Sequence, residues 1–202
     1  MINQQQFDEL RDELAIRAKN GLDFTCAASL IWLAIGYVWT LDVTPYKQSI
    51  LTFWVGAPML PLAFVLSKVF KTTWTIKTNP VQPLGLWLNF AQLFYFPLLF
   101  FVLGKMPLYF AMTYAIITGA HFFPYSWFYR NTLYAVFAGI ISVGSLLLAL
   151  WLPNGQMYIV PFFMSASLTV LTILLYLNYQ KRRQSILALQ PQESVSEQKS
   201  LR

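Results

Sequence analysis

The chain has 202 residues, of which 57% are hydrophobic, 17% aromatic and only 11% charged. Average soluble domains are about 45–50% apolar and about 25% charged, so this composition excludes a disordered protein and an ordinary soluble enzyme. The net charge is +6, but the basic residues are thinly spread, and we expect no nucleic-acid partner. A single cysteine, Cys26, excludes a disulfide framework. Because the sequence has no Cys/His cluster with zinc spacing, we expect neither a metal site nor a cofactor.

The first segment, residues 1–20, predicts an amphipathic helix and not a cleavable signal, because it has four acidic residues and no apolar run. Its apolar residues recur on one helical face: Phe7, Leu10, Leu14 and Ala18. Asn20-Gly21 is a typical helix stop. One interpretation is an interfacial helix that lies on the inner leaflet. The other is a docking site for a partner protein, or a gate.

Six apolar runs follow in residues 21–180, and most are close to the roughly 20 residues that a spanning helix needs. The runs are Leu22–Leu41, Ile50–Leu66, Leu84–Leu103, Pro107–Trp127, Thr132–Leu152 and Met157–Leu177. Because they are continuous and do not alternate with polar residues, they predict helices and not barrel strands. The predicted fold class is an all-α integral membrane six-helix bundle with an N-terminal surface helix. The polar segment 181–202 has no periodicity, and we expect a disordered cytoplasmic tail.

The basic residues predict the orientation of these spans. Six crossings place both termini on one side, and among the 14 basic residues only Lys47 and Lys105 then fall on the opposite side. Cytoplasmic loops carry the excess of Lys and Arg. The sequence therefore predicts a multi-pass membrane protein with both termini in the cytoplasm.

Several polar residues inside the predicted spans fall at one depth, in the cytoplasmic half. They are Asn89 and Gln92 in the third span and His121 and Tyr125 in the fourth. Asp23 and Arg130 lie at the inner ends of the first and fourth spans. Polar residues within spans are costly and often functional. This pattern predicts a cytoplasm-facing pocket lined by the first four residues, with the other two at its mouth, and His121 could hold a proton or a polar ligand.

A structural interpretation stands beside this one. Asn89 and Gln92 can act as hydrogen-bonding links between helices. Asp23 can cap the first helix, and Arg130 can extend to lipid phosphate. For His121 the two interpretations have equal weight.

Two further patterns concern helix shape and packing. Pro58 and Pro61 in the second span predict a kink for packing or a broken helix of the kind that marks binding sites in transporters. Small residues four apart in the fifth span, such as Ala135 and Gly139, predict close helix packing within the bundle or in a homodimer.

One stretch of the chain suggests a relationship. The run Thr118-Gly119-Ala120-His121-Phe122-Phe123-Pro124-Tyr125-Ser126-Trp127-Phe128-Tyr129-Arg130, with the opening Glu9-Leu10-Arg11 and Lys19-Asn20-Gly21, resembles an uncharacterised family of small multi-spanning bacterial membrane proteins, a domain of unknown function. The resemblance covers most of the chain up to about residue 180. It implies a bacterial cytoplasmic (inner) membrane and supplies no activity.

Two functions remain open at this point. The first is a polytopic membrane protein that binds a small solute or a lipid in the polar pocket, with transport as one form of this activity. The alternative is a non-transporting interaction or regulatory subunit that contacts a protein partner, or a second copy of the chain, through its N-terminal helix. We do not expect an enzyme, because the sequence lacks a catalytic triad, a metalloprotease motif and a P-loop.

Overall fold

The computed structural model describes residues 3–200, with side chains for residues 3–185. Within this range the chain forms helices joined by turns and loops, and no strand occurs. The helices are α1 (Gln4–Arg17), α2 (Leu22–Trp39), α3 (Pro45–Gly56), α4 (Met59–Phe70), α5 (Gln82–Leu93), α6 (Phe96–Lys105), α7 (Phe110–His121), α8 (Phe123–Phe128), α9 (Leu133–Trp151) and α10 (Ile159–Ser200), with short 3-10 turns at Lys19–Gly21, Pro107–Tyr109 and Asn154–Gln156.

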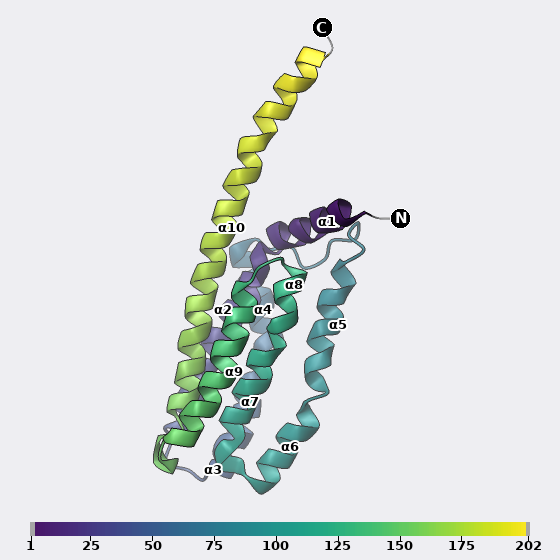
Figure 1. The fold of residues 1–202 in the computed structure, drawn as a ribbon. Coiled ribbons are helices and arrows are strands. Elements are labelled where there is room, and N and C mark those ends of the chain that lie inside the picture. The colour runs from purple at the N-terminus through teal and green to yellow at the C-terminus, as the bar shows by residue number, and fades with distance from the viewer. Residues whose placement is uncertain (1–2, 201–202) are drawn as a thin grey trace.

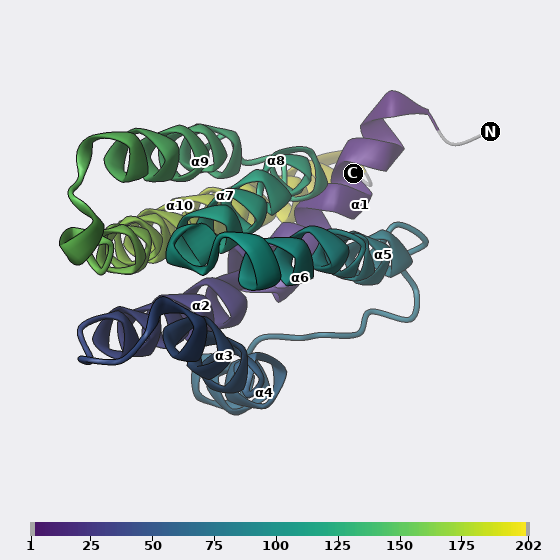
Figure 2. The ribbon, with the colours of Figure 1, turned by 90° about the horizontal axis from the view of Figure 1, so that it is seen from below.

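The long helices form an elongated bundle, and α1 lies across one end of it (Figure 1). We call this the α1 end; the opposite end carries the α2–α3 and α6–α7 connections. Viewed from that opposite end, α2 lies between α10 and the pair α3–α4, and a long connection leads from α4 to α5 on another side of the bundle (Figure 2). Helices α7 and α9 pack against each other and against α10.

Five helical segments are long and apolar enough to cross a membrane, by length and composition. They are Lys19–Trp39, Pro45–Phe70, Gln82–Lys105, Leu133–Trp151 and Asn154–Ser185. Each overlaps one of the six expected runs. The remaining run, 107–127, is divided between α7 and α8, and neither reaches the length of a span.

Interruptions near prolines divide two of these segments, Pro45–Phe70 and Gln82–Lys105, and also the remaining run, 107–127. Helix α3 gives way to α4 at Ala57 and Pro58, α5 to α6 just before Pro97, and α7 to α8 at Phe122, two residues before Pro124. Proline has no backbone N–H and its ring collides with the preceding turn, so a helix bends or restarts there. Helices α2 and α9 contain no proline and are continuous.

Helices α2 and α10 share the most extensive helix–helix contact of the bundle. The Ser29 hydroxyl donates to the backbone carbonyl of Ser165 (3.3 Å), the Ser165 hydroxyl donates back to the carbonyl of Ser29 (2.9 Å), and the Ser29 and Thr169 hydroxyl oxygens are 2.6 Å apart. Gly36 allows close approach as well, because a Cβ there would lie 2.7 Å from the Phe162 ring. Small and hydroxyl residues are the usual means by which helices come close in a membrane.

The C-terminal segment differs from the expectation of a disordered tail over residues 181–202. Helix α10 continues through it as far as Ser200, and residues 201–202 lie outside the described range. The segment 181–190 is rich in Lys, Arg, Gln, Leu and Ala, which favour helix. Arg182 also anchors the helix to the bundle by donating to the carbonyls of Tyr129 (3.1 Å) and Arg130 (2.6 Å).

Candidate functional site

Four of the predicted site residues gather where α5 faces α7 and α8. The Gln92 side-chain amide donates to the hydroxyl of Thr118 on α7 at 3.4 Å. The Tyr125 phenol donates to the backbone carbonyl of Gly85 on α5 at 3.5 Å. Asn89 donates to that same carbonyl within its own helix, at 3.0 Å. We call Asn89, Gln92, Thr118, His121 and Tyr125 the α5 seam.

His121, the single histidine of the chain, is the last residue of α7. Its ring is half-buried and meets the Tyr125 ring edge-on, with centroids 5.3 Å apart. Within residues 3–185, neither ring nitrogen forms a hydrogen bond. The imidazole is therefore held by its ring contacts, and both nitrogens are free of partners in this part of the chain.

Tyr125 ties the seam to a buried aromatic cluster at the α1 end. Its ring stacks on Tyr129, with centroids 6.0 Å apart, and Tyr129 stacks on Tyr134 of α9 at 5.8 Å. Phe128 meets Tyr129 edge-on at 4.8 Å. This cluster fixes the α8 side of the seam, because each large ring is packed against at least one other.

The α5 side of the seam is packed much less tightly. No residue of α5 is buried. In the most apolar part of the segment Gln82–Lys105 only 11% of the residues are buried, against 67% in the corresponding part of Lys19–Trp39. The two hydrogen bonds that cross the seam are also long, since N–H···O bonds are normally about 2.9–3.0 Å and O–H···O bonds about 2.7–2.8 Å. Helix α5 is thus held by few strong contacts.

The structure places Asp23 away from this seam. The Asp23 carboxylate is 1% exposed and accepts hydrogen bonds from the Thr72 hydroxyl (2.7 Å) and the Trp74 indole (2.5 Å). Trp74 also stacks on Phe24, with ring centroids 4.9 Å apart. Helix α2 begins after Gly21 with no side-chain cap, so Asp23 does not cap it. Asp23 therefore holds the α4–α5 connection against α2 through these two hydrogen bonds.

Arg130 likewise lies apart from the seam, at the α1 end, where it pairs with acids of α1. Its guanidinium is 2.8 Å from Asp12 and 3.5 Å from Asp8. Arg182 of α10 comes within 3.7 Å of Asp12 as well. The predicted six-residue set is therefore divided among three places: the α5 seam, the Asp23 contact and this ion-pair group.

Arg11, which the sequence indicates only as part of the opening motif Glu9-Leu10-Arg11, connects α1 to α8. Its guanidinium donates to the backbone carbonyl of Trp127 and lies over the Trp127 ring, 4.4 Å from the centroid. It also pairs with Asp8 at 3.1 Å. Burial lowers the pKa of Arg11, while the Asp8 carboxylate acts in the opposite direction. On another side of α1, the Asn79 amide donates to the Leu10 carbonyl at 2.8 Å. Helix α1 is thus fixed to the bundle through protein contacts.

Asparagines form a second group that the sequence did not reveal. The buried Asn20 amide donates to the Leu175 carbonyl and to the Asn178 side chain, both at 3.2 Å. Asn131, before α9, donates to the same Asn178 oxygen at 3.1 Å. The only local signal was Asn20-Gly21, interpreted as a helix stop. The partners of these residues are too distant in sequence to be inferred from spacing.

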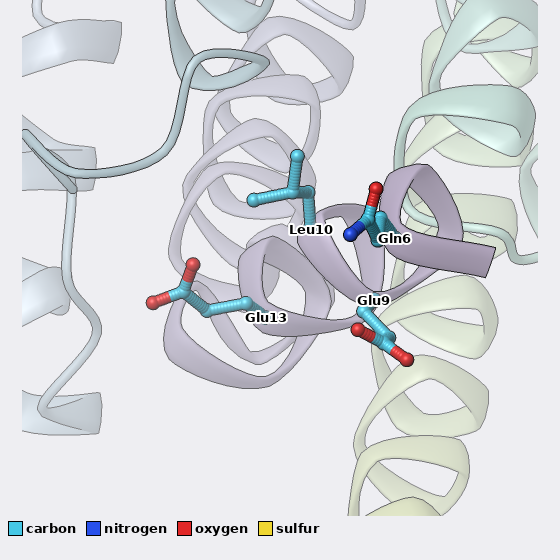
Figure 3. A pocket seen from close by; sticks show the side chains of 4 residues that line it. All are labelled: Gln6, Glu9, Leu10 and Glu13. Atoms are coloured by element: carbon cyan, nitrogen blue, oxygen red, sulfur yellow. The ribbon is translucent and has the colours of Figure 1, made fainter. Parts of the chain in front are cut away.

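A shallow, open hollow of about 410 Å³ lies on α1. Gln6, Glu9, Leu10 and Glu13 line it, as the close view of these four side chains shows (Figure 3). The hollow is separate from the α5 seam, and three of its four lining residues are polar or acidic, Leu10 being the exception.

Comparison with known protein families shows which family the chain is related to. The model of a family of unknown function, DUF7010, matches residues 7–178, a range that includes every residue of the α5 seam. No curated protein and no solved structure matches the chain. The resemblance to an uncharacterised family is confirmed, whereas bacterial origin stays a prediction. The chain belongs to this family of unknown function, DUF7010.

Proposed function

We propose that the protein crosses a membrane six times, with both termini in the cytoplasm, and binds a small polar solute at the α5 seam, with transport as one form of this activity. In this topology α7 and α8 together make the fourth crossing, and the membrane is the bacterial cytoplasmic membrane that the sequence resemblance implies. Polar side chains that pair across helices at membrane depth are by default candidates for a functional site.

The charge distribution supports the orientation. Lys47 and Lys105 lie at the end opposite α1. The α1 end carries the larger group: Arg11, Arg17, Lys19, Lys68, Lys71, Lys77, Arg130, Lys181, Arg182 and Arg183. Basic residues concentrate on the cytoplasmic side of membrane proteins, so the α1 end is assigned to the cytoplasm.

One observation carries the solute-binding proposal: polar groups face each other across the interface of α5, a helix without a buried residue. Gln92 and Tyr125 make only long hydrogen bonds, at 3.4 and 3.5 Å, and His121 makes none within residues 3–185. A solute with hydrogen-bonding groups can replace these weak contacts with shorter ones at little cost in protein–protein bonding. The amides offer both donors and acceptors, and the imidazole offers a donor or an acceptor according to its tautomer.

The α5 side chain Gln92 allows a direct test with a matched control. In a thermal-shift screen of small polar solutes on the purified full chain in nanodiscs, we expect at least one solute class to stabilise the wild type. Gln92→Leu and His121→Ala should abolish that shift. Gln82→Leu, the same change on the same helix but outside the seam, should preserve it. If Gln92→Leu and His121→Ala bind as the wild type does, the seam is only structural.

His121 gives an independent test of access, because diethyl pyrocarbonate modifies histidine and the chain has only one. We expect carbethoxylation of His121 in nanodiscs, detected by mass spectrometry, and protection by a solute found in the screen. A ring that stays unmodified until the protein is denatured would contradict access from water.

A second candidate function follows from the hollow on α1. The side chains Gln6 and Glu9 are exposed, while Arg11 anchors the other side of the helix. This arrangement suits a regulatory or interaction subunit whose α1 contacts a protein partner or a second copy of the chain. Glu9→Lys should then remove a stoichiometric partner from the purified complex, whereas Arg17→Gln, also exposed on α1, should retain it. Retention of the partner by Glu9→Lys would count against this candidate.

A further inference from the structure

One face of α2, which belongs to the most buried of the five candidate spans, is left uncovered by the rest of the bundle. Leu30, Leu33 and Tyr37 are 46%, 51% and 67% exposed, although most of their neighbours on α2 are buried. Their spacing places them on one helical face together with the half-buried Cys26, one turn nearer the α1 end. We call Cys26, Leu30, Leu33 and Tyr37 the α2 stripe.

Helices α10 and α4 both pack along α2, and neither covers this stripe. Ser29 of α2 bonds to Ser165 and Thr169 of α10. Helix α4 packs on α2 as well, and an ammonium group just before the start of α2 contacts both α4 and α10. The stripe is apolar along its length, so its natural contact in a membrane is an acyl chain.

That ammonium belongs to Lys19, at the α1 end of the stripe. Its Nζ donates to the carbonyl of Phe70, the last residue of α4, at 2.6 Å. It also lies 5.4 Å from the ring centroid of Tyr179 on α10. Lys19 is half-buried, yet no carboxylate lies within 4.0 Å of it among residues 3–185. Its charge is uncompensated, and a lysine ammonium has three donors, of which the Phe70 carbonyl takes one.

Two more cations end α4 beside this position. Lys68 and Lys71 are exposed, and neither forms an ion pair within residues 3–185. The nearby acid of α2, Asp23, is buried and occupied by Thr72 and Trp74. The α1 end therefore has three ammonium groups where α4 ends, and Lys68 lies over the Phe64 ring, 4.7 Å from its centroid. The α2 stripe begins at Cys26, four residues after α2 starts at this same end.

We propose that an anionic phospholipid binds here, with its phosphate against Lys19 and one acyl chain along the α2 stripe. Lysine is a common phosphate ligand, and Lys68 and Lys71 add attraction for an anionic headgroup. The chain bends at Asn20 and Gly21, so the distances are counted from Leu22, where α2 begins. At 1.5 Å per residue, Cys26 lies about 6 Å and Leu30 about 12 Å along α2 from there, which an acyl chain in one half of a roughly 30 Å core reaches. Tyr37 falls in the other leaflet. The site rests on the proposed crossing of α2 and not on solute binding at the α5 seam.

Cys26 is the only cysteine, so a probe for the acyl chain can be attached there without introducing a mutation. A small fluorophore on Cys26 of the full chain should be quenched more by brominated phosphatidylglycerol than by brominated phosphatidylcholine at equal mole fraction in nanodiscs. Added inorganic phosphate should leave this difference in place. Equal quenching by the two lipids, or loss of the difference with inorganic phosphate, would overturn the proposal.

Native mass spectrometry tests the headgroup contact. We expect the wild type to retain phosphatidylglycerol over phosphatidylcholine, and Lys19→Gln to lower that preference about tenfold, as loss of a charge-assisted hydrogen bond predicts. Lys77→Gln, an exposed lysine at the same end, should keep it. An equal loss in both variants, or an unchanged preference in Lys19→Gln, would overturn the proposal. Carbethoxylation of His121 is read separately, so failure at one site does not imply failure at the other.

Discussion

The phenol of Tyr134 on α9 donates a 2.5 Å hydrogen bond to the backbone carbonyl of Asn20, in the bend between α1 and α2. Asn20 and Gly21 have φ angles of 56° and 73°, in the left-handed region. Asparagine and glycine adopt this conformation at the lowest cost. Because the Asn20 side chain also binds α10, the bend that turns the chain from α1 into α2 is fixed by two distant helices. It sets where α1 lies on the bundle.

Removal of this hydrogen bond should destabilise the α1 end. Tyr134→Phe keeps the ring but leaves the buried Asn20 carbonyl without its donor, which typically costs about 1–3 kcal/mol. We expect a lower thermal unfolding midpoint of the detergent-purified protein. Tyr37→Phe, on an exposed tyrosine, is the matched control and should leave the midpoint unchanged. Equal midpoints for Tyr134→Phe and the wild type would show that this bond contributes little.

The Asp23 contact predicts the behaviour of the α4–α5 connection. Asp23→Asn removes the charge that Thr72 and Trp74 share and should weaken their hold on the connection by about 1.5 kcal/mol, since bonds to charged groups are the stronger ones. Local opening would then be about tenfold more frequent. The readout is the rate of tryptic cleavage after Lys77. Asp42→Asn, an exposed acid at the opposite end, should cleave as the wild type does.

Much of the fold could be predicted because its causes are local. The apolar run that begins at Leu22 predicts the first residue of α2 correctly. The apolar pattern predicts that the second run begins at Ile50, but α3 begins at Pro45. The missed signal is Thr44-Pro45, in which Thr44 caps the helix by accepting from Lys47 and proline suits the first helical turn. Hydropathy alone misses such a turn because its residues are polar.

The site was only partly predictable, because its contacts join residues far apart in sequence. Helical spacing placed Asn89 and Gln92 on one face and His121 near Tyr125, and the structure brings these four together. The sequence could not show that Asp23 faces Trp74, 51 residues away. It also could not show that Arg130 pairs with Asp12, 118 residues away. The depth of a residue along its predicted span does not indicate which residues of other helices its side chain contacts.

Arg11 and Asp12 should differ in their importance for the position of α1. Arg11→Ala removes a hydrogen bond to Trp127 and a cation–π contact, together worth about 2 kcal/mol. Asp12→Asn removes a partly exposed ion pair with Arg130, worth about 0–1 kcal/mol. Amide hydrogen exchange of α1 should therefore accelerate strongly in Arg11→Ala and slightly in Asp12→Asn. The reverse order would mean that the ion pairs hold α1.

The α5 seam should open when α5 is displaced from α8. A Cβ at Gly85 would lie 3.0 Å from the tip of the Phe128 ring, so Gly85→Leu must separate the two helices or move a ring of the buried aromatic cluster. Because α5 has no buried residue, we expect the helix to yield first and water to reach His121 more easily. Carbethoxylation of His121 should become faster in Gly85→Leu. Gly104→Leu on α6, where a Cβ meets nothing within 4 Å, should react at the wild-type rate. Unchanged reactivity in Gly85→Leu would show that access to His121 does not depend on the position of α5.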